Sequence, residues 1–369
     1  MAAQTVQAPK RLLFGPGPTM VDPRVYQALS QPVVGHLDPY FFEIAGEVRE
    51  NLRKVFGTKN ELTIAVSGTG SSGMETAVGN FVEPGSKFAV FANGYFCDRL
   101  TEMGKRQGAE VVRLEKPWGE TFTAAEAEEF IGREKPAVVA FVHAETSTGA
   151  LQPPKEITEA AHAAGAIVIA DVVTSLGAAP VNVDENGIDI AYSCTQKGLS
   201  CPPGLAPITV SPRALERLKA RKTPVREWYL DLNLLQEYYD GRKYHHTASA
   251  TMFYALCEGL KVILDEGLAN RFERHERMHR ILVQGLEKLG IGMHVAAGRR
   301  IPHLNTPRVP AGVDDAKVRK QLLDRHGIEI AGGFGPLAGK IFRIGIMGPL
   351  ATESSVDMFL SAFKEALAT

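Results

Sequence analysis

Between residues 62 and 210 the chain alternates short apolar segments with stretches typical of helices, and this alternation constrains the fold more than any other feature. We expect strands at Leu62–Val66, Lys87–Phe91, Glu110–Leu114, Ala137–His143, Ala166–Val172, Ile188–Ser193 and Pro207–Val210. Several of these segments are rich in Val, Ile and Ala without polar alternation, as strands buried on both faces are. Helices are expected between most of them, at Gly73–Phe81, Asp98–Gln107, Ala124–Gly132 and Pro154–Ala164. This order predicts an α/β fold with a mostly parallel sheet flanked by helices.

The two ends of the chain differ from this middle part. Residues 1–11 are polar and are expected to form an extended arm, which we take to residue 20. Asp22-Pro23 is typical of a helix start, with an acid at the N-cap and Pro at the first position. Beyond residue 250 the expected helices are Phe253–Glu266, Asn270–Leu289, Asp314–His326 and Ser354–Ala368, with strands near Met293–Ala296 and Ile341–Ile346. We therefore predict a large domain at 21–265 and a smaller α+β domain at 266–369.

Composition excludes several classes of function. The formal net charge of −1 argues against a nucleic-acid partner or an anionic membrane surface, which usually require a basic patch. The cysteines at 97, 194, 201 and 257 have neither zinc-site nor disulfide-framework spacing. His245 and His246 are adjacent, so their side chains diverge, and no third ligand is near; we predict no metal site. Without a signal peptide or an apolar run of membrane-spanning length, a cytoplasmic protein is expected.

A glycine-rich loop, Ser67-Gly68-Thr69-Gly70-Ser71-Ser72-Gly73, follows the first expected strand. It spells G-x-G-x-x-G, which in a dinucleotide site is accompanied by an acid near the end of the next strand. The next strand instead runs into Ala92-Asn93-Gly94-Tyr95-Phe96, and no acid occurs before Asp98. The loop is therefore interpreted as a general phosphate cradle, with a purely structural turn as the alternative. Glycines and a helix N-terminus present free N–H groups to an anion.

Asp171 ends one expected strand, and Lys197 follows another on a turn. By residue type alone, such an Asp is most often a cap and such a Lys is most often solvated. Together with the phosphate cradle and the aromatic Phe96, however, they make the set that pyridoxal 5′-phosphate (PLP) requires. A carboxylate keeps the pyridine nitrogen protonated, so the ring accepts electrons. An amine with a lowered pKa forms the Schiff base.

The chain resembles the class V aminotransferases of fold type I, which use PLP, and is most similar to their alanine–glyoxylate (serine–pyruvate) branch. The resemblance covers nearly the whole chain. Its motifs, in family order, are Gly15-Pro16-Gly17-Pro18, Ser67-Gly68-Thr69-Gly70, Glu145-Thr146-Ser147-Thr148-Gly149, Asp171 with Ser175-Leu176-Gly177, Ser193-Cys194-Thr195-Gln196-Lys197, Tyr244-His245-His246-Thr247 and Phe342-Arg343-Ile344-Gly345. No single motif is decisive, but the series in register is specific.

By this resemblance, Lys197 holds PLP as a Schiff base and later moves a proton between the substrate Cα and the cofactor. Asp171 pairs with the pyridine nitrogen. Gly70, Ser71 and Gln196 would hold the phosphate. These residues form the chemical centre that the resemblance implies.

The resemblance also assigns residues around this centre. Phe96 would stack on the ring, and Thr146 would lie near its polar edge. Tyr244 and Thr247 would reach the phosphate of the partner subunit's cofactor, which implies a homodimer. Arg343 would bind the substrate carboxylate, since its planar fork suits bidentate binding.

Two positions depart from relatives such as the animal enzymes, which carry Trp in place of Phe96 and His in place of Ser71.

The implied reaction moves an amino group from alanine or serine to glyoxylate, giving glycine and a 2-oxo acid. Other pairs stay open: serine–pyruvate, aspartate–glyoxylate and ureidoglycine–glyoxylate. A cysteine desulfurase would need a cysteine on a mobile late loop, whereas Cys257 lies in a helix-like run. A non-catalytic module of the same fold would usually lack the lysine.

Overall fold

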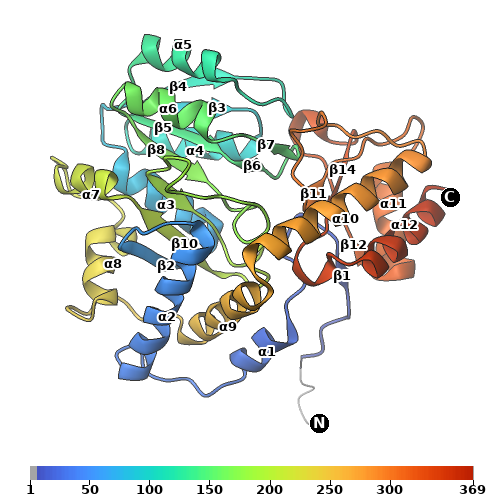
Figure 1. Cartoon of the computed structure of the whole chain (residues 1–369), viewed down its shortest axis with the longest axis horizontal. Helices are drawn as coiled ribbons and strands as arrows, with labels where there is room; N and C mark the ends of the chain where they lie inside the picture. Colours follow the sequence, from blue (N-terminus) through green and yellow to red (C-terminus); the bar gives the residue numbers. More distant parts are fainter. Residues whose placement is uncertain (1–5, 369) are drawn as a thin grey trace.

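The computed structural model describes residues 6–368 and has a seven-stranded central sheet flanked by helices (Figure 1). In spatial order the strands are β2 (Leu62–Gly68), β10 (Gly204–Val210), β9 (Ile190–Tyr192), β8 (Ile167–Asp171), β5 (Val138–Val142), β3 (Lys87–Ala92) and β4 (Glu110–Glu115). Strand β10 is antiparallel to both neighbours, and the remaining pairs are parallel. The predicted α/β fold with a mostly parallel sheet is confirmed.

The helices that flank the sheet include α3 (Gly70–Phe81), α4 (Tyr95–Arg106), α5 (Ala124–Glu134) and α6 (Lys155–Ala163). Helix α3 packs against α4, and α5 packs against α6. Helices α3 and α4 each begin three residues earlier than predicted, at Gly70 and Tyr95. Gly and aromatic residues are weak helix formers, so sequence propensity hides these two helix starts.

The N-terminal helices are α1 (Pro23–Leu29) and α2 (Pro39–Phe56), and both pack against α9 (Ala250–Glu266). As predicted, Asp22 caps α1 by accepting a hydrogen bond from the Arg24 N–H, with Pro at the start of the helix. Helices α7 (Pro212–Lys219) and α8 (Leu232–Tyr239) were not predicted. Short 3₁₀ helices lie at Trp228–Leu230, Gly335–Leu337 and Gly348–Leu350.

The C-terminal part contains the helices α10 (Leu268–Lys288), α11 (Asp315–His326) and α12 (Glu353–Leu367). They accompany a small antiparallel sheet in the order β11 (Leu304–Asn305), β14 (Phe342–Gly345) and β13 (Ala331–Gly332). A separate hairpin of β6 (Ala144–Glu145) and β7 (Ala150–Leu151) packs against this sheet, since Ala144 shares a small apolar cluster with Leu304 of β11. The predicted strand at 293–296 is wrong, since Met293 makes only an isolated bridge to Pro307. Pro307 has no N–H with which to continue a ladder.

The apolar core is divided between two main clusters in the described part of the chain. The larger cluster draws its buried residues from positions 41–263. The smaller one combines Phe14 with residues between Met278 and Ala366. Strand β1 (Leu12–Leu13) pairs with β12 (Ile328–Glu329), so this part of the N-terminal segment lies with the C-terminal elements (Figure 1). The domain bounds at 20 and 265 stay a prediction, which the two cores support; residues 1–5 of the arm lie outside the described residues.

Candidate active site

All strands of the seven-stranded sheet except β10 bring their carboxyl ends to one edge. Strands β3, β5, β8 and β9 are mutually parallel, and β2 has the same direction because β2 and β9 are both antiparallel to β10. A cavity of about 170 Å³ lies at this edge. Its lining consists of Thr69, Gly70, Ser71, Met74, Phe96, Arg99, Val142, Thr146, Asp171, Val173, Gln196 and Lys197. Ligands of α/β sheets bind at this edge, and a cavity of about 150 Å³ already holds an aromatic ring.

Asp171 is the last residue of β8 and is 3% exposed. Its Oδ1 accepts a hydrogen bond from the Val173 N–H at 2.9 Å, and its Oδ2 accepts one from the Tyr192 hydroxyl at 2.8 Å. Burial raises the pKa of Asp171 to about 6, although both hydrogen bonds and the nearby Lys197 favour the charged form. Both hydrogen bonds to the carboxylate come from neutral donors, and within residues 6–368 it makes no ion pair, so it can serve as the partner of a protonated ring nitrogen.

Lys197 lies on the turn after β9, beside the N-terminal loop. Its Nζ donates a hydrogen bond to the Pro16 carbonyl, and its own carbonyl accepts one from the Thr19 hydroxyl at 3.1 Å. A Cβ added at Gly17, where φ is +115°, would lie 2.5 Å from Lys197 Cδ, so this close approach requires glycine. Burial lowers the pKa of Lys197, which favours the neutral, nucleophilic amine. The contact between the N-terminal loop and Lys197 was not predicted.

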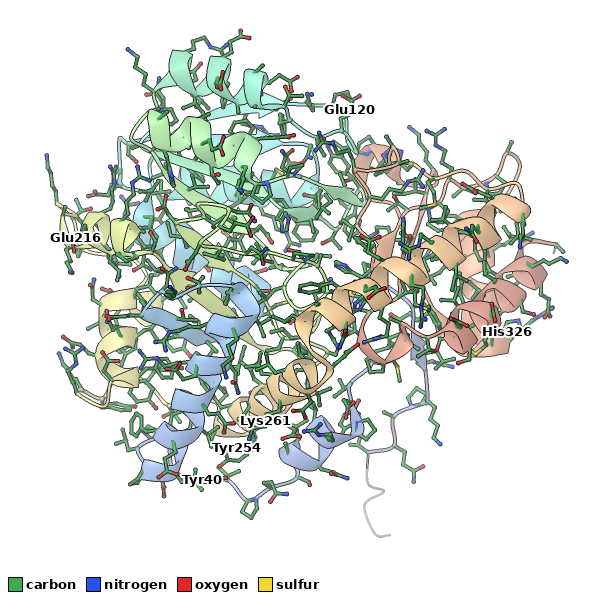
Figure 2. All side chains as sticks on the ribbon, viewed as in Figure 1. Tyr40, Glu120, Glu216, Tyr254, Lys261 and His326 are labelled. Carbon is green, nitrogen blue, oxygen red and sulfur yellow. The ribbon has the colours of Figure 1, made fainter. Side chains whose placement is uncertain are left out.

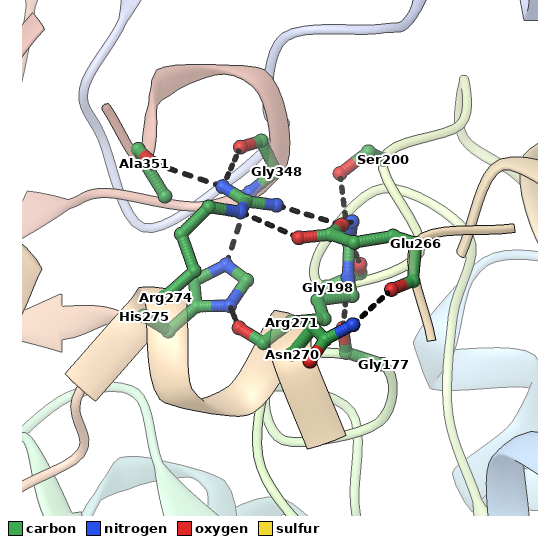
Figure 3. Close-up of polar contacts among 10 residues, drawn as sticks. All are labelled: Gly177, Gly198, Ser200, Glu266, Asn270, Arg271, Arg274, His275, Gly348 and Ala351. Carbon is green, nitrogen blue, oxygen red and sulfur yellow. Dashed lines mark hydrogen bonds and ion pairs between the residues drawn. The ribbon is translucent and has the colours of Figure 1, made fainter. Parts of the chain in front are cut away.

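A buried arginine of α10 holds the turn that follows Lys197 (Figure 3). Arg271 Nε donates to the Gly177 carbonyl at 2.6 Å, and its Nη2 donates to the Gly198 carbonyl at 2.9 Å. Gly177 and Gly198 also lie against each other, because a Cβ at Gly177 would come within 3.2 Å of the Gly198 carbonyl oxygen. One guanidinium therefore fixes the segment after Asp171 relative to the segment after Lys197.

The same cluster continues to the C-terminal part of the chain. Glu266 pairs with Arg271 at 2.9 Å and with Arg274 at 2.6 Å. Arg274 Nη1 donates to the carbonyls of Gly348 and Ala351, both at 2.9 Å (Figure 3). The start of α10 therefore connects the lysine turn to the segment that follows β14.

The first turn of α3 offers unpaired donors to the cavity. The N–H groups of Gly70 and Ser71 occupy the first two helical positions, which have no intrahelical acceptor. The N-cap residue Thr69 makes no side-chain capping bond. Gln196 lines the same cavity, and its side-chain NH₂ group is a further hydrogen-bond donor. These groups suit a bound oxyanion, which would satisfy orphan donors at a helix N-terminus.

Phe96 is the second residue of α4 and is positioned by a buried carboxylate. Its N–H donates to Glu145 Oε2 at 3.2 Å, while Glu145 Oε1 accepts bonds from the Ser147 N–H at 2.9 Å and hydroxyl at 2.6 Å. Burial raises the pKa of Glu145 to about 7. A Cβ at Gly94 would lie 2.3 Å from Glu145 Cγ. Glu145, for which no role was predicted, caps the helix that carries Phe96.

The other predicted residues lie at different distances from the cavity. Thr146 is buried in its wall and shares a hydrogen bond with the Thr174 hydroxyl. Arg343 lies on β14 outside the cavity lining, with its Nε donating to the Gly332 carbonyl at 2.7 Å. Burial lowers the pKa of Arg343 to about 10, so it stays cationic at neutral pH. Tyr244 and Thr247 are exposed and do not line this cavity.

The cysteines do not contribute reactive groups to the site. All four are free and buried. Burial raises the pKa of Cys194, Cys201 and Cys257 to about 12, so their thiols stay protonated. Cys257 lies within α9, as the sequence indicated, and not on a late loop.

Comparison with known proteins identifies the family. The family model "Aminotransferase class-V" matches residues 11–346. The (S)-ureidoglycine–glyoxylate transaminase of Bacillus subtilis is 40% identical, over 97% of this chain and 91% of its own length. The alanine–glyoxylate aminotransferase of Oryctolagus cuniculus is 38% identical, over 97% of this chain and 93% of its own. The crystal structure of alanine–glyoxylate aminotransferase from Nostoc sp. has a TM-score of 0.98 and 46% identity, covering 100% of this chain and 98% of that one.

The chain therefore belongs to the class-V aminotransferases and has their fold type I architecture. It is a PLP-dependent enzyme, as the sequence predicted. The residues present suit this cofactor, since the cavity combines a buried amine, a buried carboxylate, an aromatic side chain and the free donors at the start of α3. No helix within residues 6–368 has both the length and the apolar character needed to cross a membrane.

Proposed function

We propose that the enzyme transfers an amino group from a small amino acid, alanine or serine, to glyoxylate, giving glycine and a 2-oxo acid. The observation that carries the transamination is the buried Lys197 amine lining the same small cavity as the buried Asp171 carboxylate. The choice of substrates rests on relatives named alanine–glyoxylate aminotransferases, including the Nostoc protein at 46% identity.

The two central side chains have complementary roles in this proposal. Bound PLP supplies an electron-accepting ring that stabilises negative charge at the substrate Cα. Asp171 holds the ring nitrogen in its protonated form, because a buried carboxylate strongly favours a bound proton on its partner. Lys197 Nζ binds the cofactor in the resting enzyme and moves the Cα proton in the reaction. Its lowered pKa increases the share of the neutral amine, the form that can act as a base.

The surrounding residues bind and orient. Gly70, Ser71 and Gln196 hold the phosphate through the N–H donors at the start of α3 and the side-chain NH₂ group of Gln196, which lines the cavity. Phe96 covers the ring face, and Thr146 contacts its polar edge. Their positions in the cavity lining support these roles.

Arg343 binds the substrate carboxylate in this proposal. Among the described residues, the hydrogen bonds of its guanidinium are limited to the one from Nε to the Gly332 carbonyl, and its Cζ lies 3.9 Å from the Phe334 ring centroid. The two terminal nitrogens thus stay available as a bidentate fork. A substrate amino acid would bring its carboxylate to this fork and its amino group to the cavity.

A homodimer completes the site in this proposal, with Tyr244 and Thr247 reaching the partner subunit's cofactor. Tyr244 is 56% exposed and lies 5.3 Å from His36 between ring centroids. Val33 and Leu37, which are close to His36 in the sequence, are also exposed, at 74% and 53%. Such a group of exposed apolar side chains favours burial against a second copy.

A hollow of about 370 Å³ adjoins this apolar surface, between α1, α2 and α9. Its lining includes Tyr40, Tyr254 and Lys261, which lie together at the lower side of the molecule in Figure 2. The hollow and the exposed apolar residues together support this face as the subunit interface. The cytoplasmic location expected from the sequence stays a prediction.

A second donor is favoured by one specific observation. The Bacillus subtilis relative at 40% identity is named a ureidoglycine–glyoxylate transaminase. Ureidoglycine is larger and more polar than alanine, so the two donors make different demands on the cavity. Serine–pyruvate and aspartate–glyoxylate exchange are the remaining alternatives.

The test is a panel of donors mixed one at a time with the PLP-loaded enzyme, followed by visible absorbance. Alanine and serine are expected to convert the bound cofactor to its amino form, and glyoxylate is expected to reverse the change. Faster conversion by ureidoglycine or aspartate would replace the proposed donor. A wild-type enzyme whose cofactor no amino acid converts would contradict transamination itself.

A further inference from the structure

Arg99 lies on α4, one turn after its start, and lines the same cavity as Lys197. Its guanidinium Cζ lies 5.0 Å from the Phe96 ring centroid and 5.2 Å from that of Tyr95. Its Nη1 donates a hydrogen bond to the Ser71 hydroxyl at 3.3 Å. The guanidinium is therefore held between the aromatic residues that begin α4 and the first turn of α3. The sequence analysis did not single out this residue.

The charge of Arg99 favours the ionised form of Asp171, which lines the same cavity. Among residues 6–368 Arg99 makes no ion pair with Asp or Glu, and the adjacent Asp98 pairs instead with Arg113 at 2.8 Å. A guanidinium has five N–H donors, of which the Ser71 contact uses one. The start of α3 carries partial positive charge, which disfavours a nearby cation unless an anion lies between them. Two positive groups thus converge on one side of the cavity.

We propose that Arg99 binds the phosphate of PLP as a cationic ligand, in addition to the donors of Gly70, Ser71 and Gln196. This inference rests on the proposed function of the cavity. The Ser71 contact directs the guanidinium to the phosphate end, because Ser71 lies at the helix start that would hold the anion. The aromatic contacts orient the guanidinium plane, so its unused N–H groups form a fixed fork for a phosphate dianion.

The test compares two forms of the cofactor on the enzyme freed of PLP. Equilibrium dissociation constants are measured for PLP and for pyridoxal, which lacks the phosphate, with Arg99→Gln, Arg99→Lys and the wild type. Arg106→Gln is the matched control, since Arg106 is exposed on the same helix and pairs with Glu102. Thermal unfolding with and without inorganic phosphate gives a readout that does not depend on activity.

Arg99→Gln is expected to weaken PLP binding by about 10- to 100-fold, the range for a lost charge-assisted hydrogen bond, and to leave pyridoxal binding unchanged. Arg99→Lys is expected to lose less PLP affinity than Arg99→Gln, and Arg106→Gln is expected to keep the wild-type affinity. Stabilisation by inorganic phosphate should fall only in the Arg99 variants.

Three results would overturn the assignment: unchanged PLP affinity, an equal loss for PLP and pyridoxal, or an effect confined to KM for a dicarboxylic donor. The last result would assign Arg99 to a substrate carboxylate. A wild-type protein that binds neither PLP nor pyridoxal would instead refute the cofactor site itself.

Discussion

Asp171 and Glu145 are two buried carboxylates near the same cavity, and both receive hydrogen bonds from neutral donors. Burial raises the pKa of Asp171 to about 6 and that of Glu145 to about 7. Without the cofactor, both carboxylates must therefore ionise in a poorly solvated place as the pH rises. In the proposed holoenzyme, a protonated ring nitrogen beside Asp171 offsets this cost for one of them.

Asp171→Asn is expected to lower kcat by at least about 100-fold, because the ring nitrogen loses its charged partner. The same change should stabilise the cofactor-free protein at pH 8. Folding raises the pKa of Asp171 from 3.8 to about 6. The stability that protonated Asp171 contributes is therefore fully present below pH 3.8 and is lost as the pH rises through about 6. The expected gain at pH 8 is about 1–3 kcal/mol, and it should vanish near pH 4.

Chemical unfolding from pH 4 to pH 8 measures this difference. Asp357→Asn, at an exposed position of α12, is the control and should leave the pH profile unchanged. An Asp171→Asn protein with the same pH dependence as the wild type would contradict this account of the buried carboxylate.

At the scale of residues, the sequence indicates which side chains lie together when each stands at or after the end of a strand. Asp171 ends β8 and Lys197 follows the neighbouring strand β9, so the sheet order brings both to one cavity. The contact of Pro16 with Lys197 joins segments far apart in the chain, and Arg99 looks like an ordinary helix-surface arginine. Neither has a local pattern that indicates its partner.

At the scale of elements, the start of α4 depends on a residue that is distant in sequence. The N-cap position is Gly94, which offers no side chain for capping, and Glu145 accepts the Phe96 N–H instead. Local sequence therefore predicted a helix from Asp98, whereas the helix begins at Tyr95. The extra turn places Phe96 and Arg99 on one rigid element beside the cavity.

Gly94→Ala should destabilise the cofactor-free protein by about 1–3 kcal/mol, because the new Cβ would lie 2.3 Å from Glu145 Cγ. It should also weaken PLP binding by displacing Phe96. Gly132→Ala is the matched control in α5, where a Cβ meets no atom within 4 Å. This control is expected to be neutral or to stabilise by up to about 1 kcal/mol. Urea unfolding measures the stability change of each variant. Equal changes for the two substitutions would refute the role of the Gly94 contact.

At the scale of the whole molecule, segments from both ends of the chain meet at or near the proposed site. The N-terminal loop contacts Lys197, while Arg343 lies in the C-terminal sheet. Arg271 and Arg274, one turn apart on α10, link these parts through Glu266 (Figure 3). The alternation of strands and helices predicted the central sheet, but such long-range links cannot be seen in local periodicity.

Shared active sites make a prediction about mixed dimers. Lys197→Ala and the double variant Tyr244→Phe, Thr247→Ala should each be nearly inactive alone. Co-expressed in equal amounts, they should recover about a quarter of wild-type activity, because half of the dimers are mixed and each mixed dimer has one intact site. Steady-state kinetics measures the recovered activity, and light scattering measures the oligomeric state of the co-expressed protein. Activity no higher than the mean of the two variants would contradict sites completed across the interface.

The most direct test of the central claim is to locate the cofactor's covalent attachment. Borohydride reduction of the PLP-loaded enzyme fixes the Schiff base as a stable amine, and peptide mass spectrometry identifies the modified residue. The predicted result is modification at Lys197, with none in Lys197→Ala. Modification of a different lysine, or an unmodified wild-type enzyme, would contradict the account.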